Sequence, residues 1–234
     1  MKLLAIDSSG LVATVAIVSE EAMIAEYTVN FKKTHSQTLL PMLNEIVKMI
    51  ELDLSEVDAI AVAAGPGSFT GLRIGSATAK GLGLALDKPI VAIPTLEGLA
   101  YNLFGTNQII CPMMDARRGQ VYTGLYEFDQ YDLKVVQPQA AISIEEVLEE
   151  LNQRGREVIF LGDGTETYQS IIREKCTVPY SFAPIHLNRQ RAGAIGALGI
   201  TYYKQNWIES AAAHEPVYLR LSQAERERAE RQNQ

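Results

Sequence analysis

The sequence predicts an α/β protein built from two halves that share one order of elements. Apolar, strand-like runs alternate with helix-like segments along the chain, which is typical of α/β folds. Each half begins with a strand that ends in an aspartate turn, at Asp7 and Asp115, and later carries a strand followed by a glycine turn and a helix. The pattern predicts two subdomains, at 1–106 and 107–220, with the last segment able to pack back on the first. We expect a charged, flexible tail at 221–234.

The first half carries short apolar runs that predict strands and a broad apolar stripe that predicts its first helix. A third helix is expected before the halves join. We expect the strands at 3–7, 13–18, 23–31, 59–64 and 89–93, and the helices at 36–51, from the glycine turn to 86, and at 96–104.

The second half repeats this order. Ser143 and Glu146 have the spacing of a capping box, in which a serine side chain and a glutamate three residues later satisfy the free N–H groups of a helix start. We expect strands at 109–114, 120–128, 133–141 and 158–161, and helices at 143–153, from the glycine turn at 162–165 to 175, and at 192–205.

The composition limits the class of protein. The 28 acidic and 21 basic residues give a formal net charge of −7, and no long basic stripe is present, so tight RNA binding by this chain alone is disfavoured. No apolar run is long enough to span a bilayer. Because Asp7 interrupts the first apolar run, the N-terminus does not read as a signal peptide. These features predict a cytoplasmic protein with no membrane contact.

A glycine-rich loop at 62–75 joins an apolar strand to a helix. Glycine permits close backbone approach, and the free N–H groups of a helix start can receive an anion, so Gly65 and Gly67 are candidates for a phosphate loop. A strand-to-helix turn without a ligand is the alternative. The glycine spacing does not match a dinucleotide-binding fingerprint, and a nucleophile elbow at Ser68 has even less support.

The two aspartate turns and the two glycine turns together predict the actin-like ATPase fold, with two ribonuclease H-like subdomains facing each other across a cleft. In that fold the aspartate turns face the phosphates of a nucleotide. Two arginines in the second turn stand where small residues are expected, so they either bind an anion or a partner's carboxylates, or fill and close the cleft. We favour a structural or partner-facing role over catalysis. The candidate residues of a degenerate nucleotide cleft are Asp7, Ser8, Ser9, Gly65, Gly67, Asp115, Arg117, Arg118, Gly162 and Gly164.

The cysteines and histidines show no metal-ligand spacing. Cys111 and Cys176 lie far apart and read as two reduced, mostly buried thiols. No H-x-x-x-H or H-E-x-x-H pair exists among the three histidines, so a zinc hydrolase site has little support. We expect neither a metal site nor a catalytic residue.

The first two long helices of the first half offer a candidate protein interface. Each glycine inside a helix lowers its stability by about 1 kcal/mol relative to alanine. The several glycines of the second helix therefore indicate that close packing requires them. This packing is either contact with a second chain or burial against the domain's own sheet. The candidate interface residues are Leu39, Leu43, Ile46, Val47, Leu72, Ile74, Gly75, Ala79 and Leu82.

Taken together, these segments resemble the bacterial TsaB (YeaZ) family over almost the whole chain. The glycine loop and the Asp-Ala-Arg-Arg segment are specific in combination, although each alone would be weak. The resemblance is carried by residues 5–9, 35–36, 40–41, 65–75, 115–122 and 216–220.

The resemblance implies a function. TsaB is a paralogue of TsaD, which transfers a threonylcarbamoyl group onto the adenosine beside the tRNA anticodon and carries a metal-binding histidine pair that is absent here. It implies a non-catalytic partner that pairs with TsaD through the helices of its first domain, joins the ATPase TsaE, and self-associates when alone. It also implies that the complex, and not this chain, uses ATP or ADP with magnesium and meets tRNA.

Two other hypotheses stay open. One is a stand-alone, ATP-dependent phosphotransferase or ATPase of the actin-like class. It is disfavoured because no second acid stands near Asp7 or Asp115 to position Mg²⁺ and a water. The weaker one is a peptidase-like hydrolase.

Overall fold

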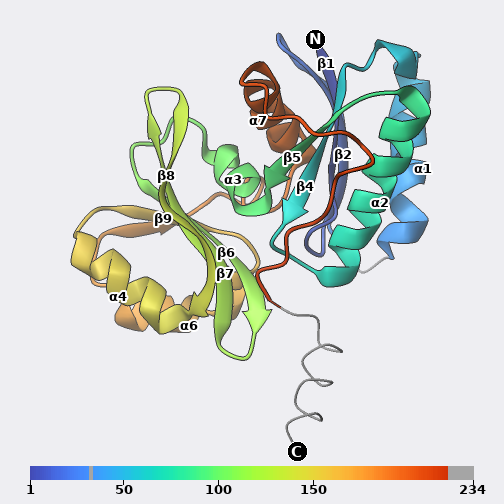
Figure 1. The fold of residues 1–234 in the computed structure, drawn as a ribbon. Coiled ribbons are helices and arrows are strands. Elements are labelled where there is room, and N and C mark those ends of the chain that lie inside the picture. Colours follow the sequence, from blue (N-terminus) through green and yellow to red (C-terminus); the bar gives the residue numbers. More distant parts are fainter. Residues whose placement is uncertain (32–33, 221–234) are drawn as a thin grey trace, which may run out of the picture.

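Two five-stranded mixed sheets form the framework of the computed structural model, which describes residues 1–31 and 34–220 (Figure 1). The first sheet has the order β3-β2-β1-β4-β5 and the second has the order β8-β7-β6-β9-β10. In both sheets the first three strands are antiparallel neighbours, and the fourth pairs in parallel with the first. The predicted repeat of two α/β halves is therefore confirmed at the level of topology.

The first half follows the expected elements closely. Strands β1 and β4 occupy the centre of the sheet and are almost completely buried, as expected for parallel strands covered on both faces. The elements are β1 (Lys2–Asp7), β2 (Ala13–Ser19), β3 (Met23–Val29), α1 (His35–Met49), a 3₁₀ turn (Leu54–Glu56), β4 (Ala59–Gly65), α2 (Phe69–Leu86), β5 (Ile90–Pro94), α3 (Thr95–Ala100) and a second 3₁₀ turn (Tyr101–Leu103).

The second half differs from the prediction in two places. The helix expected up to residue 175 is two short helices that meet at Tyr168, and a short strand, β10, was not predicted. The elements are β6 (Ile109–Arg117), β7 (Gln120–Asp129), β8 (Asp132–Ser143), α4 (Ile144–Arg154), β9 (Val158–Leu161), α5 (Gly164–Thr167), α6 (Gln169–Lys175), β10 (Tyr180–Phe182) and α7 (Ala192–Lys204).

Helices cover both faces of the first sheet. Helices α1 and α2 lie side by side on one face, and α7 lies on the other (Figure 1). The core under α1 contains Leu39, Leu43 and Ile46 packed against apolar residues of β1, β2 and β4. Across the sheet, Ile195 and Leu198 of α7 complete a second apolar layer.

The last α-helix of each half contacts the sheet of the other half. Helix α7 follows the strands of the second half, yet it packs on β1, β2 and β5 of the first sheet. Helix α3 follows the first sheet, and its Leu96 and Leu99 lie in a cluster with Ile110, Met114 and Tyr126 of the second sheet. Although α7 falls within the predicted subdomain 107–220, it therefore contributes to the core of the first one.

The last described segment, residues 209–220, runs as a strap from the first sheet to the second. It begins beside β5, where Ile90 and Glu209 form an isolated bridge, and Lys80 of α2 donates to two of its carbonyl groups. It ends at the β6–β7 turn, where the Arg220 guanidinium donates to the carbonyl of Ala116 at 2.6 Å. The tail predicted at 221–234 lies outside the described residues.

Across the described ranges, we find no helix with the length and apolar character needed to cross a lipid bilayer.

Candidate functional site

The first aspartate turn is a closed, buried structure. Asp7 ends β1 with 1% of its surface exposed, and its Oδ1 accepts a hydrogen bond of 2.8 Å from the N–H of Ser9. Burial raises the pKa of Asp7 to about 6, against the opposing effect of the Ser9 hydrogen bonds, because a carboxylate loses its hydration inside the protein. Ser8 and Ser9 are also buried. The turn is held by this internal hydrogen bond and by one of 2.9 Å that the Ser8 hydroxyl donates to the carbonyl of Gly71.

The glycine loop packs directly on this turn. The Ser68 N–H donates to the Ser9 carbonyl at 2.6 Å, and the Ser68 side chain caps α2 by accepting from the N–H of Gly71 at 3.3 Å. A Cβ on Gly67 would lie 2.3 Å from the Ser9 carbonyl oxygen. These glycines therefore let two backbone segments touch, and two of the N–H groups that could receive an anion already have partners in the chain.

Gly65 is in contact with the C-terminal strap. Its φ is +122°, and a Cβ there would lie 2.1 Å from the carbonyl oxygen of Val217. The Val217 N–H donates to the carbonyl of Ala64 at 2.7 Å, and the ring of Tyr218 packs on Phe69 with centroids 4.7 Å apart. The side of the loop that a phosphate would need is thus covered by the chain's own backbone.

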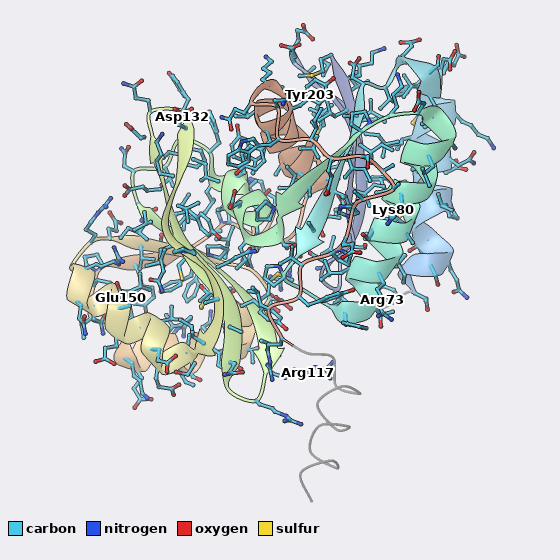
Figure 2. The ribbon with its side chains drawn as sticks, in the orientation of Figure 1. Arg73, Lys80, Arg117, Asp132, Glu150 and Tyr203 are labelled. Atoms are coloured by element: carbon cyan, nitrogen blue, oxygen red, sulfur yellow. The ribbon has the colours of Figure 1, made fainter. Side chains whose placement is uncertain are left out.

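The second aspartate turn repeats the first in backbone but not in setting. Asp115 Oδ1 accepts from the N–H of Arg117 at 2.7 Å, two residues on, as Asp7 does from Ser9. Arg117 and Arg118 adopt positive φ values of 64° and 57°, and both are exposed. Figure 2 shows Arg117 at the end of the hairpin. The hypothesis that these side chains fill and close the cleft is therefore wrong.

The second glycine turn also serves close packing. Gly162 has φ +99°, and a Cβ there would lie 2.1 Å from the carbonyl oxygen of Met113 in β6. Its N–H donates to Asn188 Oδ1 at 2.8 Å. Gly164 is buried beside the same strand, where a Cβ would meet the Met113 carbonyl oxygen at 3.0 Å. The two glycine turns thus occupy equivalent places in the two sheets.

Polar groups that the sequence did not reveal lie around these turns. The Gln190 side chain, 2% exposed, faces Gly10, and its Nε2 has no partner within the described residues. Asp163 is half-buried, and its burial raises its pKa despite the nearby Arg189. Gln190 lies in a loop without a motif, so no sequence pattern identifies it, whereas Asp163 lies inside the second glycine turn at 162–165 that the sequence did indicate.

The residues that we predicted for a protein interface belong mostly to the core. Both helices also carry exposed residues, which include Leu40 and Met49 of α1 and Ala77, Gly81 and Leu84 along one side of α2. Val47, Ile74 and Leu82 are partly buried, and they pack against the first core cluster. The prediction was wrong for the other six residues, because residues buried within the chain cannot contact a partner. These six are Leu39, Leu43, Ile46, Leu72, Gly75 and Ala79.

Glycines in α2 explain why the helix looked like an interface. A Cβ on Gly71 would lie 2.1 Å from the Ser8 carbonyl oxygen, and one on Gly83 would lie 2.7 Å from the Ala211 Cβ of the strap. A Cβ on Gly81 meets nothing within 4 Å. Gly71 and Gly83 therefore allow close contacts with the first turn and the strap of the same chain, whereas Gly81 has no such contact.

The described residues offer little for hydrolytic chemistry. Burial raises the pKa of the Cys111 thiol to about 12, so it stays protonated and a poor nucleophile. Within the described ranges no group of three acidic, histidine or cysteine side chains could hold a metal ion. His214 binds Glu209 inside the strap.

Comparison with known proteins places the chain in a family. Residues 23–228 match the TsaD family model, described as tRNA N6-adenosine threonylcarbamoyltransferase. The chain is 36% identical to the tRNA threonylcarbamoyladenosine biosynthesis protein TsaB of Bacillus subtilis over 96% of both chains. It is 30% identical to TsaB of Escherichia coli, over 74% of this chain and 76% of that one.

Solved structures agree with this relationship. YeaZ from Pseudomonas aeruginosa superposes with a TM-score of 0.80 at 27% identity, covering 93% of this chain and 99% of that one. An activator of 2-hydroxyisocaproyl-CoA dehydratase from Clostridium difficile, with a TM-score of 0.50 at 11% identity over 87% and 94% of the two chains, shares the fold alone. The chain has the actin-like fold and belongs to the TsaB family of tRNA threonylcarbamoyladenosine biosynthesis proteins.

Proposed function

We propose that this protein is a non-catalytic subunit required for threonylcarbamoylation of the adenosine beside the anticodon of tRNA. A TsaD-like paralogue carries out the transfer in this proposal, and a TsaE-like ATPase joins the pair. The names of its relatives support the pathway, and the match to a TsaD family model supports a paralogous relationship. In this proposal the protein acts in the cytoplasm, where the complex binds tRNA.

The single observation behind the non-catalytic role is the occupied glycine loop. Ser9 and Ser68 satisfy N–H groups at the start of α2, and the Val217 carbonyl lies where a phosphate would approach Gly65. A phosphate cradle needs free N–H groups and open space. The occupied loop supports our proposal that ATP or ADP and magnesium are used by the partners.

The proposed pairing surface is the exposed face of α1 and α2. Leu40 of α1 and Leu84 of α2 are 53% and 63% exposed. Ala77 and Gly81, which are also exposed on α2, have little or no side chain. Small residues let helices approach closely, and exposed apolar side chains gain free energy when a partner removes them from water. The same face serves self-association when the chain is alone.

Reconstitution tests the function. We expect modified adenosine only when this protein, a TsaD-like protein, a TsaE-like protein, ATP, a threonylcarbamoyl donor and tRNA are combined, and none with this protein alone. ATP hydrolysis by the pure protein that disappears in Asp7→Asn would instead establish the stand-alone ATPase. Peptide cleavage by the pure protein would establish the peptidase.

Substitutions at exposed positions test the pairing surface. Ala77→Glu combined with Leu84→Glu places two charges on the proposed face without disturbing the core, so we expect the complex to dissociate in size-exclusion chromatography. Ile185→Glu is the matched control, because Ile185 is 95% exposed on the second half of the chain. An intact pair with the double variant would exclude this surface.

A further inference from the structure

An unusual group of side chains lies where the glycine loop, the strap and the second aspartate turn meet. We call it the arginine surface and define it as Arg73, Arg117, Arg118 and Tyr218. All four are exposed, and Figure 2 shows Arg73 and Arg117 at the same end of the molecule. The chain is acidic overall, with a formal net charge of −7, so three neighbouring arginines require an explanation.

A series of contacts through the strap links the α2 arginine to the hairpin that carries the other two. The Arg73 guanidinium stacks over the Phe69 ring, 4.2 Å from its centroid, and the Phe69 ring packs on Tyr218. Two residues further on, at most about 7 Å along the chain, Arg220 donates to the Ala116 carbonyl beside Arg117. The strap thus contacts both the helix that carries Arg73 and the hairpin that carries Arg117 and Arg118.

The three arginines have no acidic partner within the described residues. Four other arginines form ion pairs, namely Arg154, Arg156, Arg189 and Arg191, whereas Arg173 and Arg220 have no acidic partner in the described part of the chain either. A guanidinium presents five donors in a planar fork that matches a phosphate. Arg73 keeps its donors free while its face rests on Phe69, so the surface presents prepared cationic groups to the outside.

The backbone of the second turn displays its arginines at an energetic cost. Arg117 and Arg118 both occupy the left-handed region, which costs an ordinary side chain about 1 kcal/mol or more. Asparagine or glycine would hold the same turn with less strain. The arginine side chains are therefore not explained by the needs of the hairpin, since the aspartate turn closes through the Arg117 N–H and not through either guanidinium.

We propose that the arginine surface binds the phosphodiester backbone of RNA, with a base stacked on the exposed ring of Tyr218. The inference rests on the proposed function, which supplies tRNA as the RNA. An aromatic ring beside spaced guanidinium groups is the arrangement that single-stranded or looped RNA uses. An acidic protein segment would need the arginines but not the ring, so the exposed tyrosine favours RNA.

The test measures the binding of a fluorescent tRNA transcript by anisotropy, for the chain alone and with the TsaD-like protein. The main variant is Arg117→Asn/Arg118→Asn, because asparagine tolerates the left-handed backbone and the turn should stay folded. Its control is Lys134→Gln/Arg173→Gln, which removes the same charge from exposed positions elsewhere. Tyr218→Leu is compared with Tyr218→Phe.

We expect the asparagine variant to weaken binding by about tenfold or more and to lower the slope of log affinity against log salt by about 1 to 2. The control should stay within about twofold of the wild type. Tyr218→Leu should weaken binding by about fivefold or more, whereas Tyr218→Phe, which keeps a ring, should not.

Three outcomes would overturn the inference: equal losses in the asparagine variant and its control, no measurable binding by the wild type, or displacement of the tRNA by polyglutamate as efficient as by polyuridylate. Chromatography of the same samples separates the two proposals. An intact pair that modifies tRNA but ignores the arginine substitutions refutes only the RNA surface. Arginine-dependent RNA binding without pairing refutes only the proposed partnership.

Discussion

The two subdomains have one topology but use their equivalent turns differently. In the second, Gly162 packs against the Met113 carbonyl of its own neighbouring strand. In the first, the equivalent Gly65 packs against Val217, which arrives from the far end of the chain. The second turn is thus completed locally and the first from a distance. The comparison shows that the same turn can be closed either by a neighbouring strand or by a segment from the far end of the chain.

The aspartate turns show the same contrast. Asp7 and Asp115 accept hydrogen bonds of 2.8 and 2.7 Å from the N–H two residues on, so their local geometry is alike. Asp7 is buried under the glycine loop, whereas Asp115 is half-buried near the turn of an exposed hairpin. One local motif has become part of the core in one half and part of the surface in the other.

The largest expected effect comes from the two glycine turns. Gly162→Ala forces a Cβ into left-handed backbone and against a carbonyl oxygen fixed in β6, so we expect a loss of about 3 to 5 kcal/mol in the free energy of unfolding. Gly65→Ala should cost less, about 2 to 3 kcal/mol, because the strap that carries Val217 can move away. Urea denaturation measures both.

Gly81→Ala is the control for these glycines. Gly81 is exposed within α2 with open space around its Cβ position, so alanine should stabilise the protein by about 0.5 to 1 kcal/mol. A larger loss for Gly65→Ala than for Gly162→Ala would show that the strap is as rigid as a central strand, and would contradict the distinction between the two turns.

The second prediction concerns the pH dependence that Asp7 creates. Its pKa is about 6 in the folded protein, against 3.8 for the ordinary group, so the folded state binds the proton more tightly and stability falls as pH rises between these values. Asp7→Asn removes this penalty. The variant should therefore gain about 3 kcal/mol relative to wild type between about pH 4 and pH 7.

Asp115→Asn is the matched substitution in the second turn. Both variants and the wild type are unfolded in urea at several pH values, and only the difference from wild type is compared, so titrations shared by all chains cancel. A gain of equal size for both variants would show that burial of the first turn is not the cause.

Sequence patterning predicted the strands and their two-fold repeat because buried strands need apolar runs wherever they lie. It could not predict that the last helix of each half contacts the sheet of the other half. Helix α7 is apolar and glycine-rich on most of its surface, with seven of its residues buried, so its sequence fits either sheet. Only the tertiary structure assigns it to the first.

Part of the candidate site could also be predicted from the sequence. Asp7 and Gly65 were found because turns at strand ends have a recognisable composition. The interface residues were misplaced because an apolar residue such as Leu39 or Leu43 satisfies a core and an interface equally well. The exposed positions Ala77 and Gly81 differ from the buried Ala79 only by their direction around α2.

The third prediction tests the contact between α3 and α7. The Tyr202 hydroxyl of α7 donates to Glu97 of α3, and burial raises the pKa of that carboxyl. Tyr202→Phe leaves the half-buried carboxyl without this donor, so we expect a loss of about 1 to 2 kcal/mol in unfolding free energy. Tyr203→Phe is the control, since its hydroxyl makes no hydrogen bond in the described part of the chain. Equal effects would show that the bond does not join the subdomains.

The smallest expected effect concerns the serine caps at the N-termini of α4 and α2. Ser143 accepts from the N–H of Glu146 while Glu146 accepts from the Ser143 N–H, so α4 has a complete capping box. Ser68 caps α2 in one direction only, at 3.3 Å. We expect Ser143→Ala to cost about 1 kcal/mol and Ser68→Ala about 0.5 kcal/mol, measured by the same denaturation. A larger loss at Ser68 would mean that its side chain, and not the Ser68 N–H bond to the Ser9 carbonyl, holds the glycine loop on the first turn.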